Sequence, residues 1–153
     1  MARLLLVSHC PSDNTARLRD AAVAAVQDMD LDRLSLRSLA PTQAQASDVE
    51  WCDGLLLGTT ENFGSMAGLS KDFLERIYYP CLESRQGLPL AMYIRAGQDG
   101  RGTRTQLEKI TTGLRWRLIS ETLILRGEFQ PAFERQVSEL AMTLAAGLDA
   151  GIF

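Results

Sequence analysis

The sequence predicts an α/β fold in which a parallel sheet is covered by helices on both faces. Short, nearly continuous apolar runs, typical of buried strands, alternate with longer segments whose apolar residues recur at helical spacing. Three of the runs end in loops rich in glycine or in hydroxyl and amide side chains. We count five strands and about five helices, and this alternation indicates parallel strands joined by right-handed crossovers.

Length and composition suit one soluble globular domain over residues 1–153. Hydrophobic residues make up 46% and charged residues 23% of the chain, which allows one sizeable core. The net charge of −3 argues against a nucleic-acid partner, because such proteins present a basic face, and no apolar run has membrane-spanning length. Three cysteines without CxxC spacing argue against a disulfide framework or a metal site. We therefore expect a cytoplasmic protein without a membrane partner.

The first loop, Ser8–Thr15, follows a predicted strand at Arg3–Ser8 and precedes a helix. Orphan N–H groups and the positive dipole end make a helix start an anion site, to which Ser8, Ser12, Asn14 and Thr15 add donors. The same residue types are good N-caps, so the loop by itself leaves a phosphate site and a plain cap equally open. His9 either donates a further hydrogen bond to the phosphate or is a loop residue with no functional role.

The second loop, Gly58–Gly64, lies between a predicted strand at Gly54–Thr59 and a helix from about Ser65 to Tyr79 that stops at Pro80. It is longer than a simple turn needs. The third loop, Ala96–Thr103, follows a predicted strand at Leu88–Ala96. The other predicted elements are a helix marked by Leu18 to Met29, a strand at Leu31–Leu36, a loop with one helical turn over Leu39–Asp48, a helix marked by Leu107 to Leu114, a strand within Trp116–Leu125 and a helix from Pro131.

One segment, Gly58–Arg76, resembles the second flavin-binding segment of the flavodoxin-like FMN reductases and quinone reductases. Its sequence is Gly-Thr-Thr-Glu-Asn-Phe-Gly-Ser-Met-Ala-Gly-Leu-Ser-Lys-Asp-Phe-Leu-Glu-Arg, and the family typically has Gly-Ser-Pro-x-x-Phe-Gly-x-Met-Ser-Gly-x-x-Lys-x-Phe-Leu-Asp-Arg. The chain departs from this pattern at Thr60, where proline is usual, and at Glu61. Ser8 and Asn14-Thr15 match the family's phosphate loop, although Asp13 replaces its glycine.

The resemblance implies a flavodoxin-like three-layer αβα sandwich with a five-stranded parallel sheet in the order 2-1-3-4-5. That order brings the three loops to one edge of the sheet. It also implies FMN as the cofactor, whose own chemistry makes a catalytic side chain unnecessary. The residues expected to bind it are Ser8, His9, Ser12, Asn14, Thr15, Thr59, Thr60, Glu61, Asn62, Phe63, Gly64, Ala96, Gly97, Gln98, Gly100 and Gly102.

The predicted function is that of an NAD(P)H-dependent oxidoreductase passing electrons through FMN to a quinone, a flavin or a similar small acceptor. Arg95 or Arg101 would lie near the N1–C2=O edge of the flavin. Two alternatives stay open: a flavodoxin-type electron carrier without its own substrate, and a flavin-free binding module on the same fold. Since the reductases commonly form dimers or tetramers, a homodimer is also possible.

Overall fold

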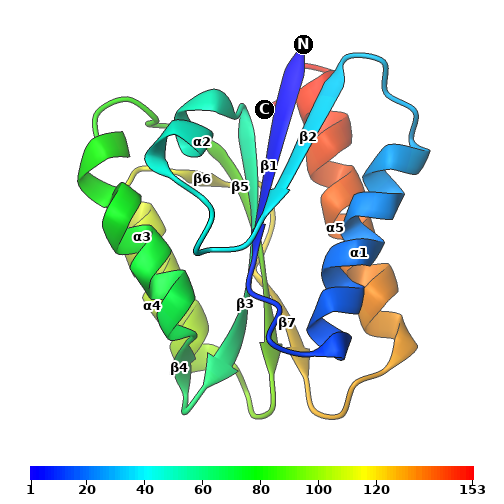
Figure 1. Ribbon diagram of the computed structural model, residues 1–153, viewed down its shortest axis with the longest axis vertical. Helices are drawn as coiled ribbons and strands as arrows, with labels where there is room; N and C mark the ends of the chain where they lie inside the picture. The colour runs from blue at the N-terminus through cyan, green and yellow to red at the C-terminus, as the bar shows by residue number, and fades with distance from the viewer.

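The computed structural model describes residues 1–153 and has three layers, with helices on both faces of one sheet (Figure 1). Helices α1 (Asp13–Asp28) and α5 (Pro131–Asp149) cover one face, and α2 (Ala46–Trp51), α3 (Gly68–Cys81) and α4 (Arg101–Gly113) cover the other. The predicted αβα architecture is therefore confirmed. None of these helices combines the length and apolar character that crossing a membrane requires.

The sheet follows the predicted strand order but contains more strands than predicted. Strands β2 (Leu34–Leu39), β1 (Ala2–Ser8), β3 (Gly54–Asn62) and β5 (Pro89–Ala96) are parallel neighbours in that order. The predicted fifth strand is divided into β6 (Arg117–Leu118) and β7 (Leu123–Arg126), both paired with β5. Between them Thr122 turns away to donate a hydrogen bond to the Glu108 carboxylate of α4, at 3.0 Å.

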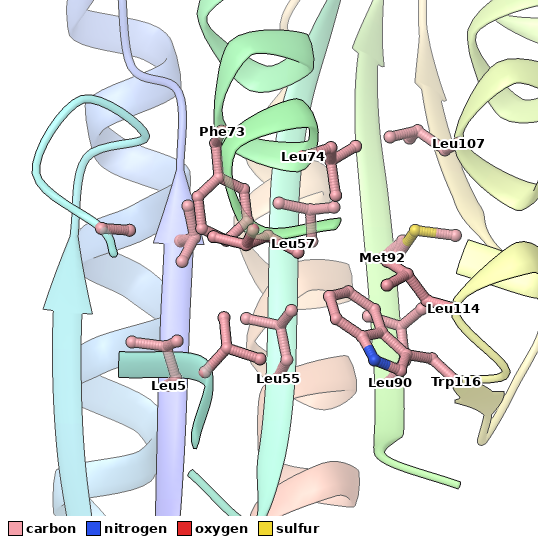
Figure 2. Close-up of a cluster of buried hydrophobic side chains, with 14 of the residues drawn as sticks. Leu5, Leu55, Leu57, Phe73, Leu74, Leu90, Met92, Leu107, Leu114 and Trp116 are labelled. Carbon is pink, nitrogen blue, oxygen red and sulfur yellow. The ribbon is translucent and has the colours of Figure 1, made fainter. Parts of the chain in front are cut away.

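The strands are buried on both faces because their side chains alternate between two hydrophobic clusters. Toward α3 and α4, the sheet residues pack against the aromatic and aliphatic side chains seen in Figure 2. This cluster includes Leu5, Leu55, Leu57, Phe73, Leu74, Leu90 and Met92. Toward α1 and α5 the sheet contributes Leu4, Leu6, Leu56, Ala91 and Tyr93. Each fully buried leucine adds about 1.5–3 kcal/mol of stabilisation, so this double burial sets the strand positions.

Strand β2 and helix α2, the two elements before β3, both differ in position from the prediction. Strand β2 is three residues later than the predicted Leu31–Leu36, because a turn at Asp30, with φ of 52°, carries the chain to a β1 pairing that begins with Ala2 opposite Leu34. Helix α2 extends beyond the helical turn predicted within Leu39–Asp48 and includes Val49 and Trp51. The spacing of Val49 and Trp51 suits either a helix or a strand, and the packing of Val49 in the core favours the helix.

The second loop is mostly strand, which corrects both its predicted length and the predicted start of α3. Strand β3 continues to Asn62, and Phe63 and Gly64 form a two-residue turn with φ of 52° and 76°. Positive φ at both central residues is typical of a type I′ hairpin. The returning residues form β4 (Ser65–Met66), antiparallel to β3. Helix α3 consequently starts at Gly68, and Pro80 lies in its last turn, where its missing N–H removes one bond only.

Candidate functional site

The carboxyl ends of β1, β3 and β5 meet at one rim of the sheet, at the lower edge of Figure 1, while both chain ends lie at the opposite edge. This is the edge where open α/β sheets bind ligands. The three predicted loops all leave the sheet here, and two adjoining pockets lie between them.

The first-loop pocket has a volume of about 240 Å³ and joins all three loops. Its lining contains no carboxylate, and Arg95 is its one charged member. The lining residues are Pro11, Ser12, Asn14, Thr15, Thr60, Asn62, Arg95 and Gly97. Asp13 is exposed and absent from this lining. The pocket therefore suits an anion by the character of its donors.

The start of α1 supplies one wall of this pocket. Ser12 and Thr15 form a reciprocal capping box: the Thr15 N–H donates to Ser12 Oγ at 3.2 Å, and the Ser12 N–H donates to Thr15 Oγ1 at 3.0 Å. Part of the loop's donor capacity is thus used within the chain. The N–H groups of Asp13 and Asn14, in the first helical turn, have no partner within the helix, and the helix dipole makes this end positive.

Strand β3 supplies the facing wall. Thr60 Oγ1 donates to Asn62 Oδ1 at 2.8 Å, which leaves the amide NH₂ of Asn62 free to donate to a ligand. Thr60 pairs with Arg95 of β5, so the two strands bring a hydroxyl and a guanidinium to neighbouring positions. This wall therefore offers the amide NH₂ of Asn62 and the guanidinium of Arg95 as hydrogen-bond donors.

The second, or hairpin, pocket has a volume of about 440 Å³ and is lined by Glu61, Phe63, Gly64, Gly97 and Gln98. It shares Gly97 with the first-loop pocket, so the two are neighbours along the rim. Phe63 is fully exposed at the hairpin tip. A bulky side chain at a φ of 52° costs about 1–3 kcal/mol, and such strain gathers at functional sites.

A carboxylate joins the hairpin to the third loop in what we name the Glu61 bridge. The Glu61 carboxylate accepts hydrogen bonds from the N–H groups of Gln98 at 2.9 Å and of Gly100 at 2.8 Å. Gln106 of α4 adds a second link, because its side chain accepts from the Met66 N–H at 2.9 Å. Two N–H groups that the sequence assigns to a ligand are therefore engaged within the protein.

Several predicted site residues lie outside both pockets. Thr59 is buried and shares a 2.7 Å hydrogen bond with Ser70, and Ala96 is buried as well. Ser8 and His9 line a separate pocket of about 590 Å³ between the first loop and the connection after β2. Partial burial lowers the pKa of His9 from its ordinary value. His9 lines this separate pocket and does not line the candidate anion site.

Several solved structures of other proteins have the same architecture as this chain. A flavodoxin from the domain Archaea superposes with a TM-score of 0.81 at 11% identity, over 95% of this chain and 98% of that one. Oxidised Flavodoxin 1 from Bacillus cereus gives 0.77 at 14% identity, over 96% and 99%. The chain has the flavodoxin fold. An oxidoreductase from Corynebacterium diphtheriae also superposes, with a TM-score of 0.68 at 18% identity, over 97% of each chain. No family model and no curated protein matches the sequence.

Within this flavodoxin fold, Arg95 is the site residue that the binding-residue prediction missed. The sequence predicts either Arg95 or Arg101 near a flavin edge; Arg95 lines the first-loop pocket, and Arg101 lines neither pocket. The sequence does carry a signal for it. A lone charge stands near the carboxyl end of the otherwise apolar run Leu88–Ala96, at the edge where ligands bind.

Proposed function

We propose that the chain binds FMN along this rim and acts as an NAD(P)H-dependent oxidoreductase that passes electrons to a quinone, a flavin or a similar small acceptor. One observation carries the proposal: three loops distant in sequence meet beside the start of α1 at a pocket that is lined by Arg95 and by hydroxyl and amide side chains and by no carboxylate. Such a pocket suits the phosphate of a nucleotide-like cofactor.

The residues present fit the two ends of FMN. The phosphate would be held in the first-loop pocket by the N–H groups that open α1, the side chains of Ser12 and Asn62, and Arg95. The flavin ring would extend toward the hairpin pocket. There Gly97 and Gly64 have open space where a side chain would otherwise stand, with nothing within 4 Å of an added Cβ. Phe63 is available to cover a ring face.

The chain's contribution is to bind, orient and expose the cofactor. Bound FMN would supply the hydride and electron transfer itself. The Glu61 bridge holds the hairpin against the third loop, so the ring side of the site is organised before any ligand enters. Preorganisation of this kind reduces the ordering cost of binding.

A reductase is favoured over an electron carrier by sequence and by charge. The segment Gly58–Arg76 resembles FMN and quinone reductases, and the net charge of −3 is weak for a protein that docks to redox partners through an acidic face. Exposed Arg101 and Arg126 lie near Asp99 around the third loop, so the charges there are mixed. A carrier is the second candidate, because the flavodoxins align with higher TM-scores than the oxidoreductase.

A visible spectrum and an FMN titration test the cofactor proposal. We expect a yellow protein, or a colourless one that quenches FMN fluorescence on titration with a saturable, one-to-one endpoint. A protein that does neither would be a flavin-free module. Steady-state oxidation of NADH and NADPH with a quinone then separates the two flavoprotein functions, since a carrier gives no turnover without a reductase partner.

A further inference from the structure

Arg95 is a partly buried arginine without an acidic partner. None of the six ion pairs in the structure includes it. Its Nη1 donates to the carbonyl oxygens of Ala96 at 3.0 Å and Leu125 at 3.1 Å. These contacts fix the guanidinium in place but leave its charge uncompensated.

Two aromatic rings lie close to the guanidinium of Arg95. Its central carbon lies 5.1 Å from the ring centroid of Phe133 and 5.9 Å from that of Phe129. Arg95 is partly buried, and the resulting loss of hydration lowers its pKa from the ordinary value. An arginine stays protonated under these conditions, so a partly dehydrated positive charge is held at a defined position.

The geometry of the first-loop pocket brings this charge to the start of a helix. Arg95 comes from β5, and Asn14 comes from the first turn of α1. The carboxylate of that turn, Asp13, is exposed and lies outside the lining. Like-signed groups facing one pocket repel each other unless an anion lies between them. The pocket lining contains no carboxylate that could serve as that anion.

We infer that Arg95 binds a phosphate monoester dianion in the first-loop pocket and selects FMN over the unphosphorylated riboflavin. The selection of FMN over riboflavin rests on the proposed function. The binding of an anion in the first-loop pocket does not depend on that function. The positive charge comes from a strand on the far side of the pocket, and the phosphate loop contributes only neutral donors. Arg95 would thus provide much of the difference in affinity between the two flavins.

Paired flavin titrations of Arg95→Gln test the selection. Loss of a charge-assisted hydrogen bond should weaken FMN binding about 10- to 100-fold, with riboflavin affinity changed less than about two-fold. A purely structural role for Arg95 would weaken both flavins equally, and that result would overturn the inference. Arg101→Gln is the matched control: it removes an exposed charge outside the pocket and should alter neither affinity.

A second variant guards against misfolding, because Arg95 also ties β5 to β7 through Leu125. Arg95→Lys keeps the charge and should retain most of the preference for FMN, although it loses the planar fork of donors. A lysine variant that folds but discriminates no better than glutamine would contradict a role for the charge.

Inorganic phosphate separates failure of this inference from failure of the proposed function. At constant ionic strength, we expect phosphate to raise the melting temperature of the wild-type protein and not that of Arg95→Gln. A protein that binds phosphate through Arg95 but neither flavin would refute the flavin function and support the anion site. A wild-type protein that responds to neither phosphate nor FMN would overturn both.

Discussion

The two ends of the rim use their hydrogen-bond donors in opposite ways. At the first-loop end, Arg95, Asn62 and the opening turn of α1 point donors into a pocket without a carboxylate. At the third-loop end, the N–H groups of Gln98 and Gly100 already donate to Glu61. Both ends are glycine-containing or polar loops after a buried strand, so their sequences alone do not separate them.

The third-loop end uses its donors to hold two loops together, whereas the first-loop end is where we propose that an external anion binds. An anion entering the third-loop end would have to displace a carboxylate bonded through two charge-assisted hydrogen bonds, each stronger than a neutral one. At the first-loop end it would instead relieve an uncompensated positive charge. We therefore expect damage to one end to leave the other largely intact.

The largest effect is expected from Gly102→Ala. A Cβ at Gly102 would lie 2.5 Å from the carbonyl oxygen of Gly64, a backbone atom of the hairpin turn. Overpacking of this kind costs about 1–3 kcal/mol and should push the hairpin away from α4, while phosphate binding is retained. Urea unfolding and phosphate titration measure the two quantities.

Gly68→Ala is the control for that substitution, because nothing lies within 4 Å of its added Cβ. It should leave stability within about 0.5 kcal/mol, the usual range for surface changes. If Gly102→Ala abolished phosphate binding as well, the two ends would not be independent and the comparison would fail.

A smaller effect is expected from removing the Glu61 bridge. Glu61→Ala frees two backbone donors at a partly exposed position, so the loss should be about 1–2 kcal/mol. Hydrogen exchange at the Gln98 and Gly100 amides should become faster, whereas exchange at the Thr15 amide, capped by Ser12, should not change. Asp99→Asn, which affects a local bond to the Arg101 N–H, is the matched control and should leave the Gln98 amide protected.

The smallest effect concerns the single histidine. Because burial lowers the pKa of His9, the unfolded chain takes up a proton more readily, and stability should decrease as the pH falls below about 6.5. His9→Gln should flatten that part of the stability profile. In an NMR titration, phosphate should leave the His9 pKa below its ordinary value, since His9 lines a different pocket. A His9 pKa above 6.5 in the presence of phosphate would place the anion beside His9 and would contradict its assignment to the first-loop pocket.

Local pattern was sufficient for the layers and the strand order. Leu4–Val7 and Leu55–Leu57 are continuous apolar runs, and such runs occur in strands covered on both faces. The residue pattern did not predict the turn at Phe63, an exposed aromatic residue that adopts positive φ. Local propensity disfavours that conformation for a bulky side chain, so the hairpin that shortens the second loop could not be inferred from residue type.

Residue pattern alone predicts which segments form the core and which loops reach the rim, because the order of apolar residues along each segment indicates which side chains are buried. The partners of each loop's polar groups depend on the tertiary structure. Glu61 and Gln98 are 37 positions apart, and Arg95 of β5 lines one pocket together with residues at the start of α1. Hydrogen bonds and charges act over a few ångströms, so their partners are set by the packing of distant segments.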